Sequence, residues 1–373
     1  MKVAILTPTL FEYSGIDRVA KKQSEDLIHK GCKVTVFALQ SEIKLDNAIN
    51  MEIIGMSRNT FFQRIYRLLF PLDFIKSIKY IKKLKNYDVI ISHHYPMNWL
   101  AYMTKKLYGV RYIYHHHPLM PTFSLGYIQR IYLNIFYFMN KVTVKNADLV
   151  LSISNFAREE FKKCTGMDSI VVYNKIDMTR FNNSINRQEI RMKYSLENSP
   201  IILFIGQIHP HKGLHLLIEA FNIVKETIPD AKLLIVGKPP LKGYFRNLKK
   251  KSNSSIIFTG FITDEELPSY YAASDVYASA SLWEGFNLPM VEAMAHSKPV
   301  VAFNIGPHEE IINLDTGFLV DKSDCEAFAQ ALIKIINEPD LAARMGHAGY
   351  KRVKEYFTSS TENIIQILEN GVN

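Results

Sequence analysis

The chain has 373 residues, of which 47 % are hydrophobic and 22 % charged, values typical of a soluble globular protein of two ordinary domains and not of a fibrous or disordered one. Its three cysteines are far apart and form neither a metal-ligand spacing nor a disulfide framework, so we expect a reducing compartment. The net charge of +9 comes from the first half of the chain, since residues 1–182 hold 26 Lys and Arg against 14 Asp and Glu. This uneven distribution of charge predicts that the first half has an anionic partner, which could be nucleic acid, a phosphorylated substrate or a membrane surface.

Short β-rich runs alternate with longer helical patterns along the first half. A helix that ends at Gly31 is predicted after the first of these runs. Strand–helix–strand alternation of this kind predicts a parallel sheet. The predicted buried strands cover residues 2–8, 33–39, 88–94, 111–117 and 149–154.

A polar stretch over residues 182–200 interrupts this pattern and is predicted to be the linker region. Strand and helix patterns then alternate again to residue 320. Two doubly wound domains follow, with a ligand expected in the cleft at the carboxyl ends of their strands. The predicted strands of the second half cover residues 201–207, 232–238, 255–261, 275–281, 299–304 and 317–320.

The segment 58–85 holds eight basic residues, one acid and six aromatics. One interpretation is one or two ordinary helices with buried apolar faces and solvated lysines. The other is a basic, aromatic surface that rests on anionic lipid. No apolar run reaches the length of about 18 residues that crosses a bilayer, so any membrane contact is expected to be peripheral.

Two carboxylates, Glu284 and Glu292, flank seven uncharged residues, and the sequence from Ser252 to Ser297 contains no Lys or Arg. The stretch is predicted to be a loop followed by a helix with Pro289 near its first turn. In one interpretation both acids accept hydrogen bonds from hydroxyls of a ligand rather than from lysines of the protein. In the other, they are acids favoured by the start of a helix.

Three consecutive histidines, His115, His116 and His117, end a predicted strand. Alternate residues of a strand point to opposite faces, so these three side chains are not expected to converge on a metal ion. His93 and His94 end the preceding strand and are candidates for the same cleft.

Four sequence blocks, in order, resemble the retaining nucleotide-sugar glycosyltransferases of family 4, which have the GT-B fold. Residues 274–320 are similar to the donor-site block of that family, which carries its E-x7-E signature. The other three blocks resemble the first glycine loop with its helix, the N-G-I-D strand end and the G-R-x-x-x-x-K-G element, and cover residues 14–31, 171–181 and 204–221.

The resemblance implies an α/β protein of two Rossmann-like domains that face each other across a cleft. The expected acceptor domain is 1–182, with a C-terminal helix of about 355–373 crossing back to it, and the expected nucleotide-sugar domain is 183–354. It also implies a cytoplasmic enzyme, peripheral on the cytoplasmic face of a membrane if the basic first domain contacts lipid.

In this family the first glutamate contacts the donor sugar, the second contacts the ribose, and a lysine neutralises the diphosphate. These roles fall to Glu284, Glu292 and Lys212, and because a fixed cation stabilises the leaving group, no metal is expected. The implied acceptor-binding residues are Gly15 and His116, and His116 joins Lys212 and Glu284 as catalytic. The implied donor-binding residues are Gly15, Gly206, Gln207, Lys212, Phe261, Glu284, Gly285, Phe286, Asn287, Leu288 and Glu292.

Three positions depart from the family pattern. Gln207 replaces an arginine, so His209, His211 or another cation is needed to compensate, or else the diphosphate is bound more weakly. Asn287 replaces a glycine, where donor preference is expected to be encoded, and Lys175 replaces the glycine of N-G-I-D.

The expected function is transfer of a sugar, mannose by the weak Y-x-H-x-P resemblance around His116, with retention. The donor is a UDP- or GDP-sugar and the acceptor a glycan or lipid-linked molecule of capsule, O-antigen or glycolipid synthesis. The alternatives are an inactive membrane-bound scaffold and a nucleotide-sugar epimerase. A nucleic-acid binder is not expected, since no such motif is present and the basic residues are scattered.

Overall fold

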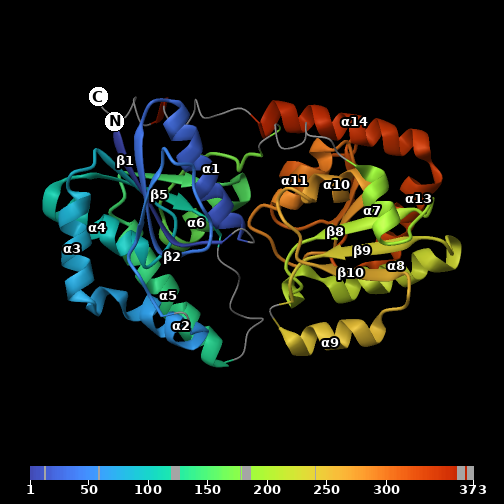
Figure 1. Ribbon diagram of the computed structural model, residues 1–373, viewed down its shortest axis with the longest axis horizontal. Helices are drawn as coiled ribbons and strands as arrows, with labels where there is room; N and C mark the ends of the chain where they lie inside the picture. The colour runs from blue at the N-terminus through green and yellow to red at the C-terminus, as the bar shows by residue number, and fades with distance from the viewer. Residues whose placement is uncertain are drawn as a thin grey trace. The chain divides into compact units, whose positions relative to one another are not determined.

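The computed structural model describes residues 1–11, 14–57, 59–118, 127–176, 178, 186–239, 241–358 and 366–367. The chain divides into two compact units, Met1–Tyr173 with Ser360–Asn373, and Asn174–Ser359 (Figure 1). The division lies before Asn174, whereas the sequence placed it after residue 182. Asp177 and the first four residues of the predicted linker, 182–185, lie outside the described residues.

The first unit contains a parallel sheet of seven strands among its described residues, in the order β3-β2-β1-β4-β5-β6-β7. Its strands are β1 (Lys2–Leu10), β2 (Lys33–Ser41), β3 (Asn50–Ile53), β4 (Val89–Ser92), β5 (Arg111–His116), β6 (Leu149–Ser152) and β7 (Ile170–Val171). Its helices are α1 (Gly15–His29), α2 (Thr60–Leu69), the 3-10 helix η1 (Phe70–Leu72), α3 (Phe74–Leu84), α4 (Met97–Tyr108), α5 (Tyr127–Val144) and α6 (Asn155–Thr165).

The second unit contains a parallel sheet of six strands in its described part, in the order β10-β9-β8-β11-β12-β13. Its strands are β8 (Ile201–Ile205), β9 (Lys232–Val236), β10 (Ile256–Gly260), β11 (Val276–Ser279), β12 (Val300–Phe303) and β13 (Gly317–Val320). Its helices are α7 (Arg187–Lys193), the 3-10 helix η4 (Pro210–Lys212), α8 (Leu214–Thr227), α9 (Lys242–Lys251), α10 (Leu267–Ala273), α11 (Leu288–Ala295), α12 (His308–Ile311), α13 (Cys325–Asn337) and α14 (Pro339–Tyr356).

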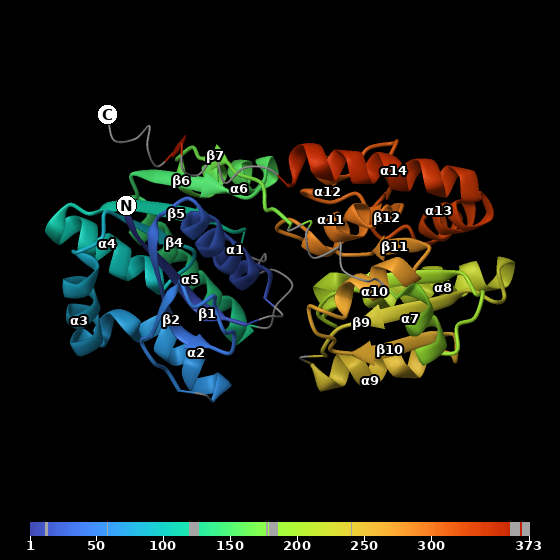
Figure 2. The same ribbon diagram turned by 45° about the horizontal axis from the view of Figure 1, so that its top comes forward.

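The prediction of two doubly wound parallel sheets is confirmed, and each predicted strand corresponds to an observed one. The sequence missed β3 and β7, which are the two edge strands of the first sheet. β3 has four residues, none of them buried, and β7 has only two, so neither contains the continuous apolar run that marks a strand buried on both faces. Figure 2 shows β7 beside β6 at one margin of the sheet.

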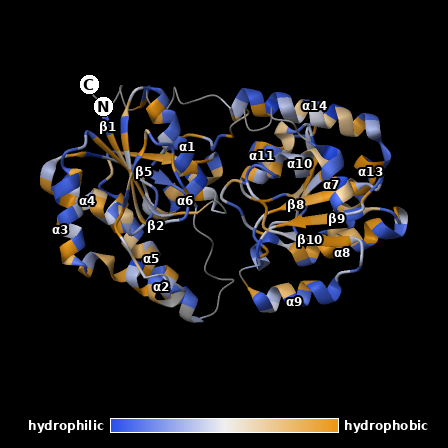
Figure 3. Ribbon diagram, viewed as in Figure 1, coloured by the Kyte–Doolittle hydropathy of each residue, from blue (hydrophilic) through white to orange (hydrophobic). Residues whose placement is uncertain are grey.

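The strands are hydrophobic on both faces because helices cover both sides of each sheet. In β1, Ala4 and Leu6 belong to one buried cluster, whereas Val3 and Ile5 belong to another on the opposite face. Figure 3 shows the same concentration of hydrophobic residues along the central strands of the two units. This two-sided burial explains why the strands were predictable as apolar runs.

The basic and aromatic segment 58–85 forms two helices, α2 and α3, joined by η1. Several large apolar side chains on them are exposed, among them Phe62, Leu72, Phe74, Ile75 and Ile78, and Ile75 is 84 % exposed. Arg58, at the start of the segment, lies outside the described residues. Among the helices that the structure describes, none is both long enough and apolar enough to pass through a bilayer.

The final described residues belong to the first unit. Ile367 packs against the buried cluster that contains Val3 and Ile5, and the Arg111 guanidinium donates a hydrogen bond of 3.2 Å to the carbonyl oxygen of Ile367. Helix α14 ends at Tyr356, and the rest of the predicted segment 355–373 lies outside the described residues apart from 357–358 and 366–367.

Candidate functional site

The candidate residues of the second unit gather at the carboxyl ends of its strands. Gly206 and Gln207 follow β8, Phe261 follows β10, and the loop with Glu284 follows β11. The carboxyl ends of parallel strands lie at one edge of the sheet, which is where doubly wound proteins bind ligands. The strand order also places β8 directly beside β11.

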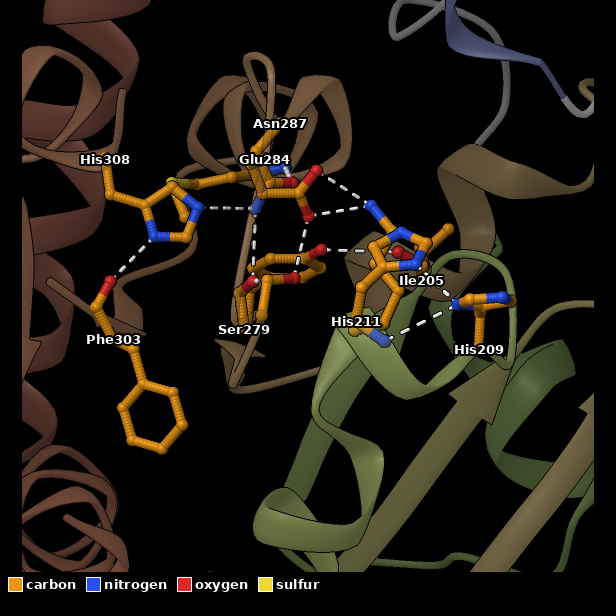
Figure 4. Close-up of polar contacts among 12 residues, drawn as sticks. Ile205, His209, His211, Ser279, Glu284, Asn287, Phe303 and His308 are labelled. Atoms are coloured by element: carbon orange, nitrogen blue, oxygen red, sulfur yellow. Dashed lines mark hydrogen bonds and ion pairs between the residues drawn. The ribbon is translucent and has the colours of Figure 1, made fainter. Parts of the chain in front are cut away.

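Glu284, labelled in Figure 4, forms a partly buried ion pair with Lys212. The Lys212 Nζ atom donates to both carboxylate oxygens of Glu284, at 2.7 and 2.8 Å, and the Ser281 hydroxyl donates to Oε1 at 2.7 Å. Burial raises the pKa of Glu284, but the charge and hydrogen bonds of Lys212 outweigh burial and hold this pKa below its ordinary value. The expectation that this carboxylate lacks a lysine partner in the protein is therefore wrong.

A close approach between two loops creates the pair. A Cβ atom on Gly213 would lie 1.7 Å from the carbonyl oxygen of Ala280, so only glycine fits between the loop after β8 and the loop after β11. The backbone N–H of Leu282 donates to the carbonyl oxygen of His211 at 2.7 Å and ties the same two loops. Lys212 and Glu284 are thus fixed by backbone contacts between two adjacent strand ends.

Asn287 is a structural anchor at the start of α11. Its φ of +119° lies in the region that favours glycine, consistent with the tolerance expected of asparagine. Its Nδ2 atom donates to Ser279 Oγ at 3.1 Å and to His308 Nε2 at 3.0 Å, while its Oδ1 accepts from the N–H of Met290 at 3.4 Å. Figure 4 shows Asn287 between Glu284 and His308.

Glu292 lies within α11 and is fully buried. The Tyr271 hydroxyl donates to its Oε2 atom at 2.8 Å, and the ring of Tyr271 stacks on His296 with 4.9 Å between centroids. The second carboxylate therefore also has a partner within the protein, although the sequence suggested hydroxyls of a ligand.

Gln207 is exposed, and the two histidines that follow it are neutral at physiological pH. His209 and His211 approach each other with their Nδ1 atoms 2.6 Å apart. Burial and the Lys212 charge lower both pKa values, that of His211 to about 4. These histidines therefore do not supply the positive charge that an arginine at residue 207 would carry.

Lys238 is a cation that the sequence analysis did not single out. It follows β9, and its carbonyl oxygen accepts a hydrogen bond of 3.0 Å from the N–H of Ile208, next to Gln207. Its Nζ atom lies 4.2 Å from the ring centroid of Phe261, which is 39 % exposed. The signal that could have found Lys238 is its place at the end of the predicted strand 232–238, beside Gly237.

The remaining donor-site candidates differ in exposure. The side chains of Phe286 and Leu288 are buried, and Phe286 packs against Phe357 with 5.7 Å between ring centroids. Neither side chain therefore presents an exposed surface to a ligand. Gly285 and Gly206 are half-buried.

The two candidates of the first unit lie on separate elements. Gly15 begins α1, and a Cβ atom added to it would meet nothing within 4 Å, so no contact among the described residues requires a glycine there. His116 ends β5, with its ring 4.9 Å from that of Phe161, and neither ring nitrogen has a hydrogen-bond partner in the described part of the chain. Burial lowers the pKa of His116 to about 3.

His115 and His117 point to the face opposite His116, as strand alternation predicted. There they meet a third histidine, His93, whose ring centroid lies 5.1 and 5.3 Å from theirs. Burial lowers the pKa values of all three histidines. His93 was predicted to lie at the same cleft, but only the three consecutive histidines were weighed as a metal site. The missed signal is that β4, which His93 follows, pairs directly with β5.

Two family models together match most of the chain. Residues 13–180 match the model described as Glycosyltransferase Family 4, and residues 186–352 match the model described as Glycosyl transferases group 1.

Three curated proteins are similar to the chain. It is 28 % identical over 239 residues to the capsular polysaccharide biosynthesis glycosyltransferase CapM of Staphylococcus aureus, covering 60 % of this chain and 62 % of CapM. It is 31 % identical over 220 residues to a GDP-mannose-dependent alpha-(1-6)-phosphatidylinositol monomannoside mannosyltransferase of Mycolicibacterium smegmatis, covering 55 % of this chain and 57 % of that protein. The chain thus spans only about three fifths of the length of these two relatives.

The third relative matches over a longer region. The chain is 25 % identical over 342 residues to the UDP-Gal:alpha-D-GlcNAc-diphosphoundecaprenol alpha-1,3-galactosyltransferase of Escherichia coli, covering 87 % of this chain and 85 % of that protein.

Solved structures share the fold. The sucrose-phosphate synthase of Thermosynechococcus elongatus superposes with a TM-score of 0.84 at 20 % identity, covering 99 % of this chain and 98 % of that one. HepE of Anabaena, in complex with UDP-glucose, superposes with a TM-score of 0.79 at 19 % identity, covering 100 % and 99 %. At these identities the likeness shows the fold alone, which is the predicted GT-B arrangement of two Rossmann-like domains.

Proposed function

The chain belongs to glycosyltransferase family 4, and from this premise we propose that it is a hexosyltransferase that moves a sugar from a nucleotide-sugar donor to a glycan or lipid-linked acceptor. The observation that carries the proposal is the Lys212–Glu284 pair at the adjacent ends of β8 and β11. It places a fixed cation and a carboxylate where a doubly wound domain holds a nucleotide.

Glu284 positions Lys212 for the leaving group. A lysine ammonium has three N–H donors, and two of them are directed to the oxygens of Glu284. The third is available to a diphosphate oxygen, where a pre-placed cation stabilises the negative charge that develops as the sugar departs. This arrangement needs no metal ion at the diphosphate.

The reaction we propose retains the configuration of the sugar. The bond between the anomeric carbon and the diphosphate oxygen breaks, and the acceptor oxygen forms its bond to the same face of that carbon. The acceptor proton passes to the leaving diphosphate, so no protein nucleophile is required. His116 and Gly15 are assigned to the acceptor on the resemblance of their sequence blocks, and Glu292 to the ribose.

Lys238 supplies the second positive charge that Gln207 lacks. Its backbone is hydrogen-bonded to Ile208, beside Gln207, and its ammonium lies over the exposed ring of Phe261. The cation is thus held at the edge of the sheet where Lys212 also lies. The face of Phe261 is the proposed platform for the nucleotide base.

GDP-mannose is the donor that we propose. The mannosyltransferase relative is GDP-mannose-dependent by name, and the Y-x-H-x-P pattern around His116 points to the same sugar. The galactosyltransferase relative, whose name specifies UDP-Gal and a diphosphoundecaprenol-linked acceptor, makes UDP-galactose the rival donor. The same name supports a lipid-linked acceptor, and that of CapM supports capsular polysaccharide synthesis.

A membrane surface is the proposed partner of α2, η1 and α3. Large apolar side chains on these elements face solvent, led by Phe62, Leu72, Phe74 and Ile75. The segment 58–85 carries eight basic residues against one acid, which complements anionic lipid headgroups. A peripheral position would bring the enzyme to a lipid-linked acceptor.

The test is a screen of nucleotide sugars for slow hydrolysis and transfer, combined with calorimetry against UDP and GDP. We expect Lys212→Met to lower turnover by a factor on the order of 10²–10³, since it removes the cation that stabilises the leaving group. The control is Lys250→Met, because Lys250 is exposed on α9. We expect the control to keep the wild-type rate.

Lys212→Met alone leaves the buried Glu284 charge unpaired, which costs about 3–5 kcal/mol of stability. The double variant Lys212→Met/Glu284→Gln removes both charges and separates lost folding from lost catalysis. A double variant that melts like the wild type and is inactive supports the proposal. Wild-type turnover in either variant overturns the role of Lys212. If the wild type binds no nucleotide, the protein is the inactive scaffold named above as an alternative. If it epimerises the donor sugar when no acceptor is present, it is a nucleotide-sugar epimerase.

A further inference from the structure

His93, His115 and His117 form a cluster within the first unit, separate from the nucleotide site proposed above. His93 follows β4, His115 lies in β5 and His117 comes just after it. The strands β4 and β5 pair in parallel with Ser92 opposite Tyr114. The residues that follow these two in the chain are His93 and His115. All three side chains are at most 3 % exposed.

The ring nitrogens of the cluster converge. His93 Nδ1 lies 3.0 Å from His117 Nε2, and one ligand atom of each histidine lies within 4.8 Å of those of the other two. Zinc–nitrogen bonds are about 2.0–2.1 Å long, so nitrogens in a tetrahedral zinc site lie about 3.3 Å apart. Small side-chain rotations therefore suffice to bring the three nitrogens to this spacing.

Two features of the cluster indicate a ligand rather than an ordinary hydrogen-bonded core. Neither ring nitrogen of His115 has a hydrogen-bond partner among the described residues, although the side chain is 2 % exposed. A buried polar atom without a partner costs about 1–3 kcal/mol and needs an explanation. The rings of His93 and His117 lie 5.1 and 4.9 Å from that of His115, and imidazoles are good ligands for transition metals.

Gln23 orients the cluster from α1. Its Oε1 atom lies 3.0 Å from His93 Nε2, and since an amide oxygen only accepts, His93 carries its proton on Nε2. His93 Nδ1 then accepts a hydrogen bond from His117 Nε2, and a metal ion would take the place of that proton, which moves to Nδ1 of His117. A hydrogen bond from the distal nitrogen of a histidine to an oxygen is the usual support of a metal-bound histidine.

We propose that His93, His115 and His117 bind a divalent transition-metal ion, with zinc as the ion that this ligand set fits best. Three imidazoles leave a fourth position for water or hydroxide, and a bound hydroxide would reduce the net charge of the buried site. The neighbouring His116 is not a ligand, because its ring faces Phe161 on the other side of the sheet. The site is independent of the nucleotide-sugar chemistry proposed above.

The test uses untagged full-length protein, stripped with a chelator and dialysed. Zinc is titrated by calorimetry, bound metal is counted by mass spectrometry, and cobalt is added to detect the visible absorption of nitrogen-ligated Co²⁺. We expect one tightly bound zinc ion per chain, a raised melting temperature, and no response to magnesium, which prefers oxygen ligands.

The variants identify the ligands. His115→Gln should weaken zinc binding at least tenfold and abolish the metal-dependent rise in melting temperature. Gln23→Leu should weaken binding by about 10–100-fold, as loss of an orienting hydrogen bond does. His116→Gln, one residue away on the opposite face, and His211→Gln, in the partly buried histidine pair of the second unit, should bind zinc as the wild type does.

Melting of each metal-free variant shows whether it is folded, so weakened binding by a folded His115→Gln protein supports the proposal. Absence of zinc binding by the wild type overturns it. Unchanged affinity in His115→Gln, or loss of binding in His211→Gln, also overturns it, because the zinc would then lie elsewhere.

Discussion

Asn287 illustrates how one residue serves the fold where the sequence suggested a role in donor preference. Both ends of its amide are used within the protein: Nδ2 holds Ser279 and His308, and Oδ1 caps α11. The His308 Nδ1 atom donates onward to the carbonyl oxygen of Phe303 at 2.8 Å, so the asparagine connects the ends of β11 and β12. Its amide therefore anchors two strand ends and is not directed at a ligand.

At the residue scale, the buried carboxyl group of Asp17 leads to a prediction about how the stability of the protein depends on pH. Burial raises its pKa to about 7, although hydrogen bonds from the N–H of Phe11 and the hydroxyl of Thr9 oppose the shift. The native state therefore binds a proton more tightly than the unfolded chain, whose pKa is 3.8. The contribution of this group to the free energy of unfolding is fully present below about pH 4 and is lost as the pH rises through about 7.

Asp17→Asn should remove this dependence, because the amide oxygen still accepts both hydrogen bonds and does not ionise. From pH 5 to pH 8 the wild type should lose about 2–3 kcal/mol of unfolding free energy relative to the variant. Urea unfolding at several pH values measures the difference, in which the contributions of the buried histidines cancel. Asp26→Asn, on the same helix, is the control. Parallel profiles for the wild type and Asp17→Asn would contradict the prediction.

At the scale of elements, the loops after β8 and β11 act as one unit. Gly213 packs on the carbonyl oxygen of Ala280, Leu282 bonds to His211, and Lys212 reaches Glu284. The backbone contacts fix the distance between the loops, and the ion pair is made at that distance.

Gly213→Ala should therefore affect both stability and activity. The added Cβ would lie 1.7 Å from Ala280 O, and the φ of +63° is unfavourable for alanine, so we expect a loss of at least about 2 kcal/mol. Chemical unfolding measures this loss. The rate of donor hydrolysis should also fall, because moving the two loops apart separates Lys212 from Glu284.

The matched control is Gly243→Ala in α9. A Cβ atom there meets nothing within 4 Å, and alanine favours a helix, so the same substitution should stabilise by about 0.5–1 kcal/mol. Equal effects of the two substitutions would refute the role assigned to Gly213.

At the scale of the whole molecule, charge and exposed apolar surface are concentrated in the same half. The first 182 residues carry the excess of basic residues, and the exposed apolar side chains of α2, η1 and α3 lie within them. The second unit exposes single apolar residues such as Leu314. This distribution is the basis for the proposed contact with anionic lipid.

Flotation with vesicles of phosphatidylcholine, with and without phosphatidylglycerol, tests this contact. The protein should float only with the anionic vesicles, and less so at high salt, because exposed charges are screened. Ile75→Asp should reduce the bound fraction about tenfold, since it places a carboxylate on the lipid-facing surface.

Leu314→Asp is the control, because Leu314 is 86 % exposed and Ile75 is 84 % exposed. If both variants float equally well, or if the wild type does not float, α2 and α3 are ordinary surface helices and the proposal fails.

The sequence by itself determined the two parallel sheets and the strand ends that carry the site. The central strands are buried on both faces, so each is an uninterrupted apolar run, and the residues that follow β8, β10 and β11 could be named in advance. The edge strands β3 and β7 were missed because half-exposed strands lack that signal.

Only the tertiary structure decided which side chains meet. Lys212 and Glu284 are 72 residues apart, and they pair because β8 and β11 are neighbours in the sheet although two strands separate them in the chain. His93 joins His115 and His117 for the same reason, across β4 and β5. Periodicity predicts an element and its buried face, whereas contacts between loops depend on the order and register of the strands, which no local pattern encodes.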